Sequence, residues 1–254
     1  AFWLPDYALF MALKTAHKGA AWHDWEPELV RRDPTALEKA RRTYADEIGF
    51  WQAVQYLFFT QWSALKTYAN EKGVQIIGDL PIYVAADSVD VWASPEEFQL
   101  DEDLLPTEVA GCPPDAFSAT GQLWGNPLYD WEEMKKTGYA WWVRRIRHTC
   151  EIYDVVRIDH FRGFAGYYAI PYGDETAVGG RWRTGPGIDL FRTIERELGR
   201  REIIAEDLGF LPPDVYELLA ATGYPGMKVR EFAFDSRDGG GDLPHSYPRT
   251  CVAY

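Results

Sequence analysis

The chain has 254 residues, and 26 Lys and Arg against 39 Asp and Glu give it a formal net charge of −13. Such an acidic chain lacks the basic face that nucleic acids and anionic membranes attract, so we expect neither as a partner. With 46% hydrophobic residues, the chain is too apolar to be disordered. No apolar run reaches the roughly 18 residues that a membrane-spanning helix needs.

The chain has three scattered cysteines: Cys112, Cys150 and Cys251. They are too few and too dispersed for a disulfide framework or a zinc site, which favours a reducing compartment. We therefore expect a cytoplasmic protein, or a plastid protein if a transit peptide precedes Ala1. Residues 1–14 lack the basic start of a signal peptide, and residues 249–254 read as a strand in mid-run. These two features predict a segment of a longer protein.

Aromatic residues are abundant, with 11 Trp, 15 Tyr and 13 Phe. Sugar rings stack on aromatic side chains, and their hydroxyl groups hydrogen-bond to acids, so an acidic, aromatic-rich chain is typical of sugar-binding proteins. An aromatic-rich core gives the same composition, and composition alone favours that simpler interpretation.

The first part of the chain has helical patterns. Residues 6–17 predict a short helix, and a loop with two tryptophans follows. A longer helical pattern covers residues 35–72, with Asp33 before Pro34 as its N-cap. Gly49 is the position at which we expect this helix to bend or break.

Five short apolar runs predict β-strands: 74–79, 155–159, 202–207, 227–234 and 250–254. Helical patterns at 188–198 and 212–221 separate the later runs. Strands that alternate with helices predict parallel βα units.

Three of the predicted strands close on an acidic residue, at Asp79, Asp159 and Glu206. Acids at the carboxyl ends of parallel strands favour a (β/α)8 TIM barrel, in which functional groups gather at that end. A doubly wound sheet is the competing architecture, but no glycine-rich phosphate loop follows any of these strands. The segment at about 85–142 has little periodicity, which predicts a long loop or helical insertion at the functional face.

Asp159 and Glu206 end consecutive predicted strands and are the natural pair for glycoside cleavage with retention, which needs two carboxylates roughly 5–5.5 Å apart. Arg157 lies on the same strand face as Asp159 and is expected to keep it ionised by lowering its pKa. Glu206 needs a raised pKa to act as an acid. For any one of these acids alone, a helix cap or a surface ion pair is the simpler interpretation.

Metal binding is a rival interpretation, because Asp159-His160 and Glu206-Asp207 supply oxygen and imidazole ligands. Their spacing matches no dedicated metal motif such as HExxH, so we expect no metal and no other cofactor.

At these residues the sequence resembles the 4-α-glucanotransferases of glycoside hydrolase family 77, called amylomaltase in bacteria and disproportionating enzyme in plants. The matching stretches occur in the family's order and cover most of the chain. They are IIGDLPIYVAADSVDVW, GCPPDAFSATGQLWGNPLYDW, VVRIDHFRGF, IIAEDLG and GMKVREFAFD.

The resemblance implies that Asp159 is the nucleophile that forms a glucosyl-enzyme and that Glu206 is the general acid/base. It also implies that Arg157 and His160 lie around the nucleophile and the bound glucose, and that Asp79 contacts substrate.

The family's loop beside the active cleft corresponds to the stretch that contains Trp124 and Asn126. The resemblance implies that Trp124 contacts sugar. It also places Phe232, at the end of the next predicted strand, in the lining of the cleft.

The chain departs from the family pattern because the family's third catalytic carboxylate lies beyond Tyr254. By resemblance the chain covers about strands 3 to 7 of the barrel, with a helical segment at 1–73 and a partial catalytic barrel at 74–254. A barrel that cannot close exposes edge strands and apolar surface. We therefore expect this chain alone to be poorly stable and inactive.

The implied reaction moves α-1,4-glucan segments between malto-oligosaccharides, or to glucose, without a cofactor. Transfer and hydrolysis share the glucosyl-enzyme, and the residues alone do not separate them. A retaining α-glucan hydrolase and a non-catalytic glucan-binding protein are therefore the two alternatives.

Overall fold

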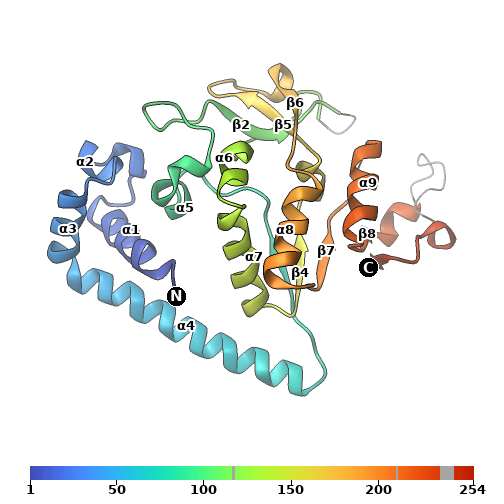
Figure 1. Ribbon diagram of the computed structural model, residues 1–254, viewed down its shortest axis with the longest axis horizontal. Coiled ribbons are helices and arrows are strands. Elements are labelled where there is room, and N and C mark those ends of the chain that lie inside the picture. The colour runs from blue at the N-terminus through green and yellow to red at the C-terminus, as the bar shows by residue number, and fades with distance from the viewer. Residues whose placement is uncertain (116–117, 210, 235–242) are drawn as a thin grey trace.

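The computed structural model describes residues 1–115, 118–209, 211–234 and 243–254. It is an α/β fold in which N-terminal helices flank a layer of helices and short strands (Figure 1). No described helix is both long enough and apolar enough to cross a membrane.

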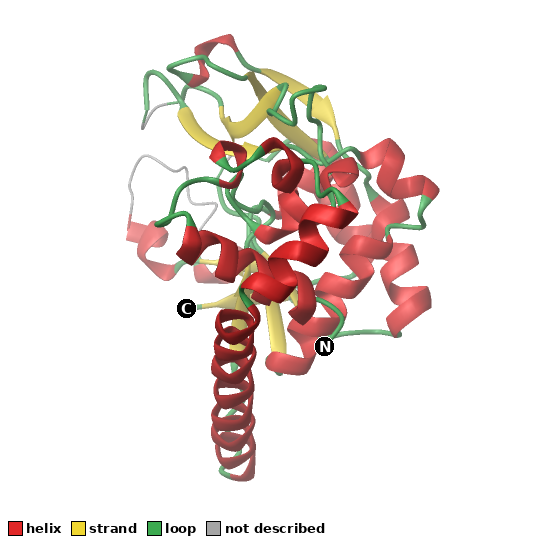
Figure 2. Ribbon diagram, turned by 90° about the vertical axis from the view of Figure 1, so that its left-hand side faces the viewer, coloured by secondary structure: helices red, strands yellow, loops and turns green. Residues whose placement is uncertain are grey.

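The N-terminal part is helical, as predicted. Its helices are α1 (Leu4–Ala16), α2 (Pro27–Val30), α3 (Pro34–Thr43) and α4 (Ala45–Glu71). The Asp33 side chain caps α3 by accepting hydrogen bonds from the backbone of Thr35 and Ala36. In Figure 2, α4 projects from the rest of the molecule.

The expected break at Gly49 is wrong. The helical pattern is interrupted at Tyr44, whose φ of −110° ends α3 immediately before α4 begins. Gly49 lies inside α4, where no atom lies within 4 Å of its missing Cβ position. Nothing there demands the conformational freedom of glycine, so the helix continues through it.

The five predicted strands are present, although they are shorter than predicted. Strands β1 (Ile77–Leu80), β4 (Val155–Ile158) and β7 (Ile203–Ala205) form a parallel sheet, and β8 (Gly226–Lys228) pairs with β9 (Cys251–Ala253). The two sheets meet where the Ala205 amide donates to the Pro225 carbonyl at 2.9 Å. Helices α8 (Ile188–Leu198) and α9 (Pro213–Thr222) lie between the later strands, as the patterns predicted.

These sheets are small, and none of the sheets in the described part of the chain is closed. The α/β class is confirmed. The predicted strand at 227–234 is wrong beyond Lys228, because β8 ends there and a 3-10 helix covers Arg230–Phe234. One further hydrogen bond, from the Arg230 amide to the Tyr254 carbonyl at 2.9 Å, continues the pairing as the chain enters this helix.

The segment at about 85–142 is built of regular elements, so its interpretation as a long insertion with little regular structure is wrong in part. It contains α5 (Val89–Ala93), β2 (Glu108–Cys112), β3 (Gln122–Pro127) and α6 (Trp131–Lys136), and α7 (Ala140–Ile152) begins at its end. Strands β2 and β3 join β5 (Gly166–Pro171) and β6 (Arg181–Thr184) in an antiparallel sheet of order β3-β2-β5-β6. This sheet lies at the upper edge of Figure 1, beyond α6 and α8.

Most tryptophans lie in the core, which confirms the simpler interpretation of the composition for them. The tryptophans with at most 9% exposure are Trp22, Trp25, Trp92, Trp131, Trp141 and Trp142. Two others are exposed and lie on the antiparallel sheet, Trp124 on β3 at 37% and Trp182 on β6 at 45%.

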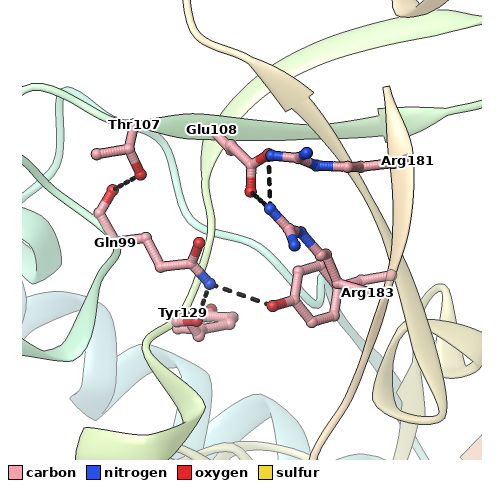
Figure 3. Close-up of polar contacts among 7 residues, drawn as sticks. Gln99, Thr107, Glu108, Tyr129, Arg181 and Arg183 are labelled. Carbon is pink, nitrogen blue, oxygen red and sulfur yellow. Dashed lines mark hydrogen bonds and ion pairs between the residues drawn. The ribbon is translucent and has the colours of Figure 1, made fainter. Parts of the chain in front are cut away.

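A charged cluster crosses the antiparallel sheet. The Glu108 carboxylate of β2 faces two guanidinium groups of β6 (Figure 3), with Arg181 Nη2 at 2.9 Å and Arg183 Nη2 at 3.0 Å. Beside it, Gln99 Nε2 donates to the Tyr129 carbonyl at 2.9 Å. Only 12% of the Glu108 side chain is exposed, so its charge depends on these two partners.

We expect Glu108→Gln to lower the free energy of unfolding by about 1–2 kcal/mol, because both arginines lose their shared anion. Urea unfolding of the chain, followed by tryptophan fluorescence, measures the change. The matched control is Glu38→Gln, which removes the exposed ion pair with Arg42 and should cost less than about 0.5 kcal/mol. Equal effects in the two variants would mean that the cluster does not stabilise the sheet.

Candidate functional site

The three acids predicted at strand ends lie at one edge of the parallel sheet. Asp79 of β1 is directly opposite Arg157 of β4 in the register. The ladder continues one residue past the strand ends, because the Asp159 amide donates to the Leu80 carbonyl at 3.0 Å and the Glu206 amide donates to the Ile158 carbonyl at 2.9 Å. The backbone pairing therefore fixes the positions from which the Asp159 and Glu206 side chains extend.

Arg157 connects this edge across three strands. Its Nη1 pairs with Asp79 Oδ1, and its Nη2 lies 2.9 Å from Asp159 Oδ1. Its Nε donates to the Met227 sulfur of β8 at 3.2 Å. The prediction that Arg157 and Asp159 share a strand face is confirmed, and Asp159 has a cation beside its carboxylate.

Glu206 lies in a different environment. Its Oε2 accepts from the His160 amide at 2.9 Å, and its Oε1 accepts from the Leu208 amide at 2.8 Å. Burial raises the pKa of Glu206, and the negative charge of Asp159 raises it further against the two backbone donors. The environment of Glu206 thus favours its protonated form, which is what a general acid needs.

His160 follows Asp159 in a left-handed backbone conformation with φ of 51°. The turn is close-packed, because a Cβ on Gly163 would lie 3.1 Å from His160 Cδ2. Burial lowers the pKa of His160 to about 4, and the positive charge of Arg162 adds to this effect. The imidazole is therefore neutral at pH 7.

Trp124 reaches this site from the antiparallel sheet. Its ring meets the His160 ring edge to face, with centroids 4.9 Å apart and an interplanar angle of 85°. The Trp124 indole NH donates to Gln122 Oε1 at 3.0 Å. With 37% of its surface exposed, Trp124 is available to a ligand beside His160.

The remaining two predicted residues differ in placement. Asn126 Nδ2 donates to the Val84 carbonyl at 2.8 Å, so this amide ties β3 to the segment after β1. The backbone of Phe232 lies in the 3-10 helix rather than at a strand end, and its side chain is outside the described residues.

The sequence reasoning missed two residues that support Arg157. The Asp207 carboxylate accepts from the Met227 amide at 2.6 Å, and Met227 in turn places its sulfur against Arg157. Glycine is required at position 226, because a Cβ there would lie 2.4 Å from Asp207 Oδ2. For Asp207, its position next to Glu206 was a signal available in the sequence. For Met227 there was none, because a buried methionine has no distinguishing sequence pattern.

The fold and the site define an α/β protein in which two carboxyl groups, those of Asp159 and Glu206, lie at the carboxyl end of one parallel sheet. A sequence-family profile described as 4-alpha-glucanotransferase matches residues 1–254, so the chain belongs to this family.

Curated relatives and a solved structure agree with this assignment. The chain is 49% identical over 253 residues to a 4-alpha-glucanotransferase of Clostridium butyricum, covering 99% of this chain and 52% of the relative. It is 46% identical over 252 residues to the chloroplastic/amyloplastic 4-alpha-glucanotransferase of Solanum tuberosum, covering 99% of this chain and 44% of the relative. An amylomaltase from Streptococcus agalactiae in complex with acarbose superposes with a TM-score of 0.96 at 46% identity, covering 99% of this chain and 51% of that chain. The chain spans about half the length of the curated relatives it matches.

We expect Asp159→Asn to lower the pKa of Glu206, because it removes a negative charge that opposes ionisation and frees Arg157 to act on Glu206. Carbon-13 NMR of the glutamate side-chain carboxyl groups across a pH titration measures the shift. The control is Asp79→Asn, which removes an exposed carboxylate that contacts Arg157 but not Glu206. An unchanged Glu206 pKa in Asp159→Asn would show that the two carboxyl groups are electrostatically independent.

Proposed function

We propose that the protein that carries this chain is a 4-α-glucanotransferase that moves α-1,4-glucan segments between malto-oligosaccharides, or to glucose. The observation that carries the proposal is the pairing of Asp159, held by Arg157, with Glu206, whose pKa is raised by burial. Family membership supports the reaction, and the different environments of the two carboxyl groups support their different roles. We also propose a cytoplasmic location, based on the three free cysteines in the described residues.

In the first half of the reaction, an Asp159 carboxylate oxygen attacks the anomeric carbon of the donor. Glu206, protonated, gives its proton to the glycosidic oxygen as the bond between that oxygen and the anomeric carbon breaks. The products are a glucosyl ester on Asp159 and a shortened glucan that leaves with the proton. The raised pKa of Glu206 favours the protonated form that this step consumes.

In the second half, the Glu206 carboxylate takes the proton from the 4-hydroxyl of an acceptor glucan. That oxygen attacks the anomeric carbon, and the ester bond to Asp159 breaks. Two inversions give retention, and both residues return to their starting protonation states. No cofactor enters either half.

The neighbouring residues have supporting roles in this proposal. Arg157 holds the Asp159 carboxylate in place and is itself held by Asp79, which also contacts substrate. Neutral His160 hydrogen-bonds the bound glucose, and Trp124 stacks on sugar beside it. The hydrogen bond of Asn126 to the segment after β1 supports a role in holding the Trp124 strand beside the cleft.

We further propose that β1, β4, β7, β8 and β9 are about strands 3 to 7 of a (β/α)8 barrel, with residues 1–73 as a preceding helical segment and residues 74–254 as a partial catalytic barrel. The parallel pairings between neighbouring strands support this reading. Solvent-exposed apolar side chains also support it. Those at least 55% exposed include Phe50, Tyr56 and Leu57 on α4 and Ile77 on β1. The chain alone is therefore expected to be inactive.

Maltotriose disproportionation tests the function. The whole protein, incubated with maltotriose alone, should produce glucose together with maltopentaose and longer chains, as followed by chromatography over time. Glu206→Gln should slow both products by about 10²–10⁴-fold, because proton transfer to the leaving oxygen is lost. Asp159→Asn should abolish both, because no ester can form.

The matched control is Glu202→Gln, an exposed acid just before the same strand, which should retain wild-type rates. Glucose and maltose without longer chains would make the protein a retaining hydrolase and refute transfer. Binding of acarbose without any product would make it a glucan-binding protein.

A further inference from the structure

The two exposed tryptophans lie on opposite edges of the antiparallel sheet. Its strand order is β3-β2-β5-β6, so Trp124 and Trp182 belong to its outermost strands. Three inter-strand spacings separate these strands by about 14 Å. Trp124 contacts His160, the residue after Asp159, and so marks the side of the nucleophile.

Trp182 is held on two sides. The Arg162 guanidinium lies over its ring, 4.2 Å from the centroid. Tyr168, directly opposite in the register with β5, meets it at 66° with centroids 5.2 Å apart. Nevertheless 45% of Trp182 is exposed, which leaves apolar ring surface open to solvent. An aromatic ring held in this way loses little conformational entropy when a ligand stacks on it.

Arg162 connects Trp182 to the other carboxyl group. It follows Phe161, whose amide donates to the Glu206 carbonyl at 3.1 Å, while the His160 amide donates to Glu206 Oε2. The negative charge of Glu206 in turn acts on the Arg162 guanidinium, whose pKa it raises against the larger lowering effect of burial. Trp182 is therefore linked through Arg162 to the turn that holds Glu206, and Trp124 is linked to the same turn through His160.

The proposed reaction places a ligand beside Glu206. Glu206 protonates the leaving oxygen and later deprotonates the incoming hydroxyl, so the leaving glucan and the acceptor glucan both occupy the space beyond Glu206. The apolar face of a glucose ring is a suitable partner for the open surface of an aromatic ring.

We propose that Trp182 is an acceptor subsite that stacks a glucose unit of the incoming α-glucan, with Arg162 as the residue that positions its ring. The proposal rests on the transferase function. A sugar ring can stack on Trp182, whereas a water molecule cannot. Trp182 therefore favours transfer of the glucosyl group to a glucan over its hydrolysis.

The test separates the two halves of the reaction in the whole protein. Fluoride release from α-maltosyl fluoride reports formation of the glucosyl-enzyme, and labelled maltose as acceptor reports transfer. Trp182→Ala should raise the KM for the acceptor about tenfold and lower the ratio of transfer to hydrolysis, with fluoride release in acceptor-free buffer within about twofold of wild type. Trp182→Phe should restore most of the acceptor affinity.

Two further variants sharpen the result. Arg162→Lys keeps the charge near Glu206 but loses the planar stack, so it should raise the acceptor KM without moving the pH profile of fluoride release. Tyr172→Ala removes a 54% exposed aromatic just after β5 that is not assigned to the site, and should leave the acceptor KM unchanged.

Three outcomes would overturn the proposal. An unchanged acceptor KM in Trp182→Ala would show that no acceptor stacks there. A parallel fall in fluoride release and in melting temperature, also in Trp182→Phe, would make Trp182 a structural residue. If the wild-type protein releases fluoride but never lengthens maltotriose, the transferase function itself fails, and the acceptor subsite fails with it.

Discussion

The ion pairs of Arg157 are the interaction on which the site depends. Asp79 and Asp159 lie at the same edge of a parallel sheet, where two carboxylates without a cation between them would repel each other. Arg157 reaches both through its two terminal nitrogens and donates from its third nitrogen, Nε, to the Met227 sulfur. Because β1, β4 and β8 all contribute partners, the position of Asp159 depends on the packing of three strands rather than on its own rotamer. Asp207 extends this support by fixing the backbone of Met227.

The second sheet is coupled to this edge by a tight turn. The 3-10 helix at Phe161–Phe164 follows Asp159 and His160 directly. A Cβ on Gly185 would lie 2.3 Å from the Phe164 carbonyl oxygen, so the chain leaving β6 passes against this turn with no room for a side chain. The Gly185 amide also donates to the Ala165 carbonyl at 2.8 Å. This contact brings the sheet with Trp124 and Trp182 to the edge of the parallel sheet that carries Asp159.

The parts that sequence predicted well are those with local signals. The helix at 188–198 was placed to the residue, and the acids at 79, 159 and 206 were assigned to strand ends because an apolar run before each acid is a local pattern. The antiparallel sheet was missed in part because β2 and β5, which join its two halves, pair across a large sequence separation, with β4 between them in the chain. The support of Arg157 by Met227 was missed for the same reason, because a side-chain contact between distant strands produces no periodic pattern in the sequence.

Aromatic composition illustrates why function needs the structure. The tryptophans of the core and the two exposed tryptophans are chemically identical, so composition does not distinguish them. What distinguishes Trp124 and Trp182 is exposure combined with a charged or titratable partner, His160 in one case and Arg162 in the other. Those two partners follow Asp159 in one short turn that also hydrogen-bonds Glu206, so the fold connects both exposed rings to the turn between the two carboxyl groups.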